Sequence, residues 1–210
     1  MASGHSIVAA KMEPQKFGVY FGGKVLPPEE DAPEWGPWVA KHEMTGWSVI
    51  NTRDATFSAR FIADNAADFD GPFLAYTVLY DTNESWVSFY ESGECLWSVS
   101  HDGSTGDKHH LEITGNPPKV LDEIVTDHHA VMEEQGPDHP MDWGREIPVA
   151  LAEDIIGMRH DVELCEPDVL EYYALQRAEK TVDLDDYELV LPDRSKGLNI
   201  LDLMSIFSKK

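Results

Sequence analysis

The sequence is poor in basic residues and contains no long apolar segment. Among its 210 residues, 16 are Lys or Arg and 39 are Asp or Glu, which gives a net charge of −23 with His neutral. Nucleic-acid binding depends on Lys and Arg that displace counterions from phosphates, so DNA, RNA and anionic membrane surfaces are unfavourable partners. No apolar run approaches the roughly 18 residues of a membrane-spanning helix. The charge instead favours a cationic partner, such as a basic protein.

Cysteine is also scarce, and targeting features are missing. The two cysteines, Cys95 and Cys165, lie far apart in the sequence and form neither a CxxC motif nor a zinc-type spacing. We expect two ordinary thiols rather than a disulfide. The N-terminal residues lack the charged and apolar regions of a signal peptide, so we expect a cytoplasmic location.

Short motifs of catalysis and cofactor binding are absent. The sequence has no GxxxxGK[ST], GxGxxG, GxSxG or HExxH pattern. The segment 64–71, DNAADFDG, resembles a calcium loop, but Ala66 occupies the first ligand position and cannot bind the ion. We therefore expect no cofactor and no metal.

The N-terminal half has the composition of β-strands. Runs rich in Val, Ile, Thr and aromatic residues alternate with short turn segments. Such short separators favour a meandering antiparallel sheet over residues 1–115. The expected strands are 6–12, 16–21, 47–53, 56–64, 72–80, 85–91, 95–101 and 109–114. Residues 22–46, with four prolines, are expected to form a loop.

The C-terminal half has helical periodicity. Apolar residues recur every three to four positions in 119–136, 147–161 and 167–180. Strands followed by helices indicate an α+β fold, a single domain over 1–180 with the helices of 116–180 on one face of the sheet. Residues 181–210 are interpreted as an acidic linker and a helical tail. This C-terminal helix offers a surface for a homodimer.

Histidines are the best candidates for chemistry. His101 and Asp102 end one expected strand, and His109 and His110 open the next. Strand pairing would bring His101, Asp102 and His110 together as weak catalytic candidates. Zinc needs three or four ligands held by further contacts, and too few converge here to predict a metal site.

Three aromatic residues of the expected sheet form a second candidate site. If Trp86, Tyr90 and Trp97 share an exposed face, they provide a binding platform, and cation–π contacts would suit Arg or Lys of a partner. The alternative is that these side chains only pair across strands and support the sheet.

Function is inferred mainly from charge. We expect a non-enzymatic acidic module that recognises a cationic protein, as an immunity protein or antitoxin does. The alternative is a metal-dependent hydrolase with a His/Asp site around residues 101–110.

Overall fold

The structure, a computed structural model, describes most of the chain. It covers residues 3–29, 31, 33, 36–136, 139–161, 169–177, 187–189 and 207–209. The strands are β1 (Gly4–Ala10), β2 (Gly23–Glu29), β3 (Trp38–His42), β4 (Ser48–Thr52), β5 (Phe73–Leu79), β6 (Glu84–Glu91), β7 (Glu94–Asp102), β8 (Glu112–Gly115), β9 (Val169–Arg177), β10 (Tyr187–Leu189) and β11 (Phe207–Lys209). The helices are α1 (Pro14–Phe17), α2 (Phe57–Asn65), α3 (Val120–Gln135) and α4 (Trp143–Ile156), with short 3-10 turns η1 (Gly18–Phe21) and η2 (Gly103–Thr105).

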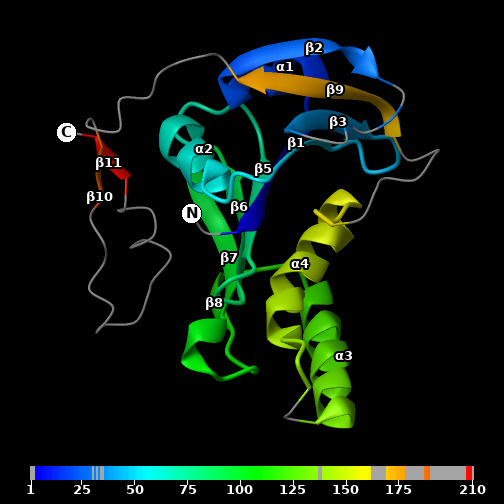
Figure 1. The fold of residues 1–210 in the computed structure, drawn as a ribbon, viewed down its shortest axis with the longest axis vertical. Helices are drawn as coiled ribbons and strands as arrows, with labels where there is room; N and C mark the ends of the chain where they lie inside the picture. Colours follow the sequence, from blue (N-terminus) through cyan, green and yellow to red (C-terminus); the bar gives the residue numbers. More distant parts are fainter. Residues whose placement is uncertain are drawn as a thin grey trace.

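Nine strands form one antiparallel sheet in the order β2-β9-β3-β4-β1-β5-β6-β7-β8. The strands from β5 to β8 form the meander that the sequence predicts. Figure 1 shows a strong twist, because β2, β9 and β3 run across the top while β6 and β7 run nearly vertically. The expected α+β class is confirmed.

Both faces of the sheet are covered. In the central strand β1, Ile7, Val8, Ala9 and Ala10 are fully buried, which is possible only if side chains of both orientations meet other elements. One face packs on α1, η1 and α2, and the other on α3 and α4. Within 116–180, the helices α3 and α4 lie on one face of the sheet as expected. The cover of the other face by α1, η1 and α2 was not expected, and it is needed because a central strand with apolar residues in succession is buried on each side.

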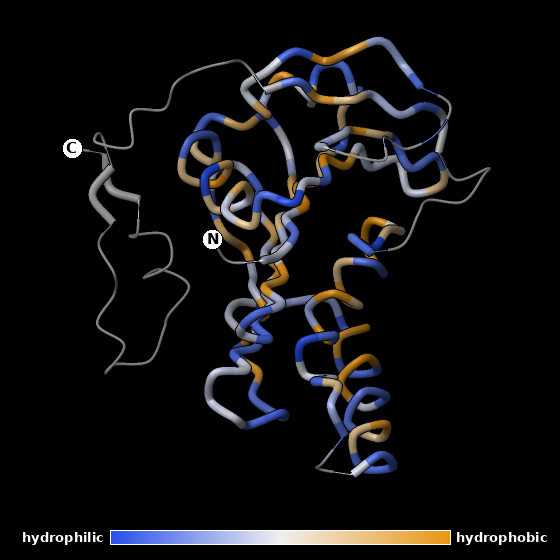
Figure 2. Tube along the Cα trace, viewed as in Figure 1, coloured by the Kyte–Doolittle hydropathy of each residue, from blue (hydrophilic) through white to orange (hydrophobic). Residues whose placement is uncertain are grey.

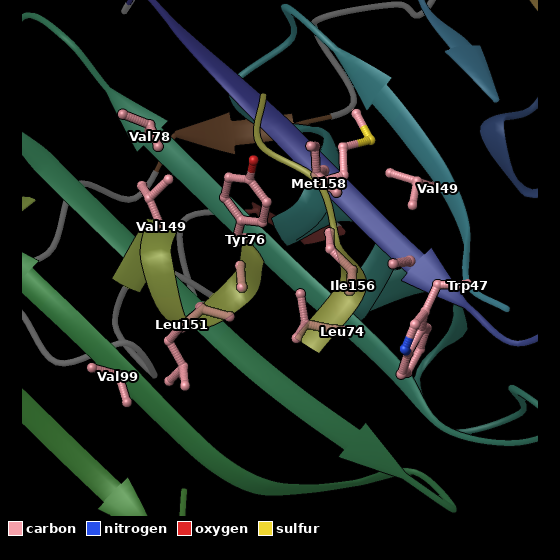
Figure 3. Close-up of a cluster of buried hydrophobic side chains, with 14 of the residues drawn as sticks. Trp47, Val49, Leu74, Tyr76, Val78, Val99, Val149, Leu151, Ile156 and Met158 are labelled. Carbon is pink, nitrogen blue, oxygen red and sulfur yellow. The ribbon is translucent and has the colours of Figure 1, made fainter. Parts of the chain in front are cut away.

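Figure 3 shows the core on the α4 side of the sheet. Leu151 and Ile156 of α4 are fully buried against Leu74 and Tyr76 of β5. This contact fixes α4 directly on the sheet. Figure 1 shows α3 on the side of α4 away from the sheet, and α3 packs mainly on α4.

Residues 56–64 were expected to form a strand and instead form most of α2. Phe57, Phe61 and Ile62 are buried and lie on one side of a helix with a period of 3.6. The segment is rich in aromatic and β-branched residues, which obscured that period.

Residues 167–180 were expected to form a helix, but 169–177 form β9. Tyr173 and Leu175 pack on the α2 side, whereas Tyr172 contacts Trp38 at 5.3 Å between ring centroids. These side chains alternate because β9 pairs with β2 and β3 on its two edges. Pairing with distant strands therefore overrides the local helix propensity.

The expected loop 22–46 contains two strands, β2 and β3. Pro27 and Pro28 in β2 are tolerated because β2 is an edge strand and its register shifts between Val25 and Pro28.

Two helices agree with the sequence analysis. α3 ends before Gly136 as expected. α4 begins at Trp143, four residues before the predicted start, because the Asp142 side chain accepts a hydrogen bond from the Gly144 amide and caps the helix.

The predicted C-terminal tail lies largely outside the described residues, as does Cys165. Within the tail, residues 207–209 form β11 and pair antiparallel with β10 in 187–189. Residues 207–209 are therefore a strand, whereas a helix was expected. Cys95 is an exposed free thiol. In the described part of the chain, no helix combines the length and the apolar character needed to cross a membrane.

Truncating a core side chain of α4 tests whether α4 packs on the sheet in this way. We expect Leu151→Ala to lower the free energy of unfolding by about 2–5 kcal/mol, since Leu151 is fully buried and the cavity cannot refill. Urea unfolding followed by tryptophan fluorescence measures the change. Leu96→Ala is the control, because Leu96 is exposed and its loss should cost less than about 1 kcal/mol. Equal losses would contradict the assigned core.

Candidate functional site

His101 is a buried residue at the C-terminal end of β7. Only 2% of the residue is exposed. Its Nδ1 lies 2.7 Å from the carbonyl oxygen of His110, and its Nε2 lies 3.2 Å from a carboxylate oxygen of Asp142. Both partners are acceptors, so either ring nitrogen finds an acceptor for a hydrogen that it carries. His101 thereby joins β7 to the 103–111 loop and to the start of α4.

His110 and Asp102 lie beside His101 but direct their polar atoms elsewhere. The Asp102 backbone amide donates to His110 Nδ1 at 3.1 Å, and the Asp102 carboxylate accepts from the Ser104 amide at 2.9 Å. The hairpin therefore brings the three predicted residues together, as the sequence suggests. Their contacts are local and hold the loop, and neither nitrogen of His101 is free to act on a bound molecule.

Histidines of α3 approach the same loop. The ring of His129 lies 4.6 Å from the ring of His109, measured between centroids. Burial and the neighbouring His109 lower the pKa of His129 below its ordinary value. Among the described residues, no three His, Cys, Asp or Glu side chains are arranged to hold a metal ion.

The aromatic residues predicted as a platform do not share a face. Trp97 lies on the α4 side, where its ring stacks on Phe89 at 5.8 Å. Tyr90 and Trp86 lie on the α2 side, and Tyr90 stacks on Phe73 at 4.8 Å. Tyr90 and Trp97 are buried, so both support the sheet through ring contacts.

A pocket of about 400 Å³ lies beside the loop that His101 contacts. The loop after η2 forms one wall, the C-terminal half of α3 the second, and the start of α4 the third. Lys108 joins two of these walls, since its ammonium donates to the carbonyl oxygen of His139 at 2.7 Å. The contacts of His101 with Asp142 and with the loop therefore position this pocket.

The lining of the pocket combines apolar, aromatic and acidic groups. Met132 and Trp143 supply apolar surface, and Asp107 and Glu133 supply exposed carboxylates. The indole Nε1 of Trp143 donates to Gln135 at 2.8 Å, which fixes the ring plane. Such a mixture is typical of small ligand sites, whose volumes run from about 300 to 1,000 Å³.

The outer face of α3 is acidic along its whole length. The helix carries five exposed carboxylates and no Lys or Arg: Asp122, Glu123, Asp127, Glu133 and Glu134. None of the five takes part in the ion pairs found among the described residues. Figure 2 shows hydrophilic and hydrophobic positions alternating along α3, as expected for a helix with one packed side.

A second polar cluster lies under the segment after α4, and the sequence analysis missed it. His160 is buried against His5 at 5.4 Å and against Tyr76 at 6.0 Å, measured between ring centroids. Within the described residues, the Tyr76 hydroxyl and His160 Nδ1 have no hydrogen-bond partner. Burial lowers the pKa of His160 to about 4.

An ion-pair network closes this cluster. Glu146 binds Arg145 and Arg159, each at 2.9 Å. Burial acts to raise the pKa of Glu146, but hydrogen bonds from the two arginines outweigh it and lower the pKa below its ordinary value. The network fixes the chain beyond α4 on the sheet. The sequence signal for the His160 cluster was limited to His5 and Asn51, two polar residues in the central strands β1 and β4.

Comparisons of the chain with protein-family models, with curated proteins and with solved structures found no match.

The close packing around His101 makes a testable prediction at Gly144. A Cβ at this position would lie 2.5 Å from the His101 ring and 2.4 Å from the carbonyl oxygen of Lys108. A Gly-to-Ala change inside a helix ordinarily stabilises by about 0.5–1 kcal/mol. We expect Gly144→Ala to destabilise instead, by about 1–3 kcal/mol in urea unfolding. A stabilised variant would show that the contacts of His101 do not require this glycine.

His160 should make stability depend on pH. Its pKa is about 4 in the folded chain and near the ordinary 6.5 when unfolded, so the unfolded chain binds the proton first as pH falls. This contribution to the free energy of unfolding is fully present above about pH 6.5 and falls as the pH decreases to about 4. The loss reaches about 2 kcal/mol at pH 5. We expect His160→Leu to lose about 2 kcal/mol less than the wild type between pH 7.5 and pH 5. Identical pH dependence in both proteins would refute this role.

Proposed function

We propose that the chain is a non-enzymatic protein-binding module that recognises a cationic protein through the outer face of α3. The observation that carries the proposal is the row of five exposed carboxylates on a helix without Lys or Arg. An immunity protein that neutralises a basic toxin is one form of such a module.

The position of α3 supports this role. It packs mainly on α4, and Leu121 and Met132 are its only buried residues. Its acidic side is therefore open to a partner. All five carboxylate residues on that side are exposed, so no described element covers them. A partner can therefore reach the full length of the helix.

The charges themselves favour an incoming cation. Glu123 and Asp127 are four residues apart on the helix, where like charges cost about 0.2–0.5 kcal/mol. Glu133 and Glu134 lie in the last turn, where the helix dipole already places negative charge. Basic groups of a partner would relieve both repulsions. Long-range attraction would also speed association, and added salt would weaken it.

Neutralising the first half of this face tests the proposal. The variant combines Asp122→Asn, Glu123→Gln and Asp127→Asn. We expect the wild type, immobilised, to recover a basic protein from lysate of its source cells at low salt, and the variant to recover much less. Affinity for the purified partner, measured by calorimetry, should fall at least tenfold.

The matched control removes the same charge elsewhere. Asp64, Asp68 and Asp70 are exposed residues in and after α2, on the other side of the sheet. Their triple change to Asn should leave partner recovery close to wild type. Equal losses in both triple variants would show that the effect depends only on net charge. Recovery of no basic protein would refute the proposed function.

A further inference from the structure

We infer that the pocket at the C-terminal end of α3 receives an arginine side chain of the cationic partner. This inference rests on the proposed function and names the group that the acidic face would orient. The pocket is continuous with that face, because Glu133 belongs to both. A partner that lies along α3 would thus place the basic residue nearest the C-terminal end of the helix in the pocket.

The floor of the pocket suits the apolar part of an arginine. Met132 is buried, with 8% of its area exposed, and Met141 adds a flexible thioether nearby. These side chains would pack on the methylene groups of the incoming residue. The indole of Trp143 offers an aromatic face of the kind that attracts a cation.

The aromatic wall is already fixed in place. Trp143 is held by its bond to Gln135, and the ring of His139 stacks beside it at 6.4 Å with an interplanar angle of 22°. The ring of His128 lies 6.2 Å from the same indole. Because these contacts exist before any partner binds, little ordering cost is added on association.

The electrostatics of the pocket call for a cation. The last turn of α3 has no basic residue, and the carboxylate of Glu133 adds to the negative end of the helix dipole. Asp107 contributes a second carboxylate from the opposite wall. Lys108 adds one positive charge to the lining, so the two carboxylates leave these three groups with a net charge of −1.

Arginine fits this environment better than lysine does. Its planar guanidinium stacks on aromatic rings, is weakly hydrated and binds carboxylates through two parallel hydrogen bonds. Lysine offers a compact, strongly hydrated charge that loses more on entering an aromatic pocket. The site should therefore prefer arginine, and it should reject an uncharged analogue of the same shape.

A titration of the full-length, ¹⁵N-labelled protein with N-acetyl-arginine N-methylamide tests the inference directly. We expect saturable shifts of the Trp143 indole N–H and of the amides of Gly106 and His109, with a millimolar dissociation constant. The Trp143 signal is identified by its absence in Trp143→Leu. N-acetyl-citrulline N-methylamide, which has nearly the same shape without the charge, should cause no such shifts, and the lysine analogue should bind more weakly.

Two surface variants on the same helix provide the matched comparison. Glu133→Gln should weaken binding of the arginine compound by about two- to fivefold, the effect of one exposed ion pair. Glu123→Gln removes the same charge about 15 Å away along the helix and should leave the dissociation constant unchanged. Both residues are exposed, so neither change should affect folding.

The outcomes separate this inference from the function on which it rests. Equal shifts with arginine and citrulline, shifts confined to other residues, or equal effects of the two variants would overturn the arginine site. If the α3 triple variant still loses its partner in that case, the acidic face remains the binding surface. If arginine fills the pocket but no basic protein is recovered, the arginine site stands and the proposed function fails.

Discussion

The arrangement of this molecule depends on burying the central strands of the sheet from both sides. β1 has four successive fully buried apolar residues, Ile7 to Ala10, and a strand of that kind is stable only between two layers. One layer is supplied by α1, η1 and α2, and the other by α4. α4 lies directly on this face of the sheet, and α3 packs mainly on α4 while its Leu121 joins the same core. The exposed acidic side of α3 is thus a consequence of how the core is filled.

Burial also constrains the polar groups near α3. A buried imidazole needs partners for its nitrogens, and His101 finds them in the carbonyl of His110 and the carboxylate of Asp142. Asp142 also caps α4 through its other oxygen. One buried histidine therefore links strand, loop and helix. A histidine with both nitrogens engaged is suited to holding a structure together.

Sequence periodicity predicted the parts of this fold whose partners are near in the chain. β5, β6 and β7 follow one another with short turns, and α3 and α4 show clear helical spacing. It failed for α2 and β9, where the decisive contacts are distant: Tyr172 and Tyr173 alternate only because β2 and β3 lie on either side. The candidate site shows the same division. The approach of His101 and His110 followed from an expected hairpin, whereas Asp142 and Trp143 come from a later helix that no local pattern connects to it.

The place of β9 in the sheet has a consequence for synthesis of the chain. β2 is made early, yet its neighbour in the sheet is β9, which is made more than a hundred residues later. Until β9 emerges, β2 has no strand to pair with, and the edge of β3 that β9 will occupy stays open. Pro27 and Pro28 remove two amide donors from β2 during this interval, which reduces its capacity to pair with strands of other nascent chains.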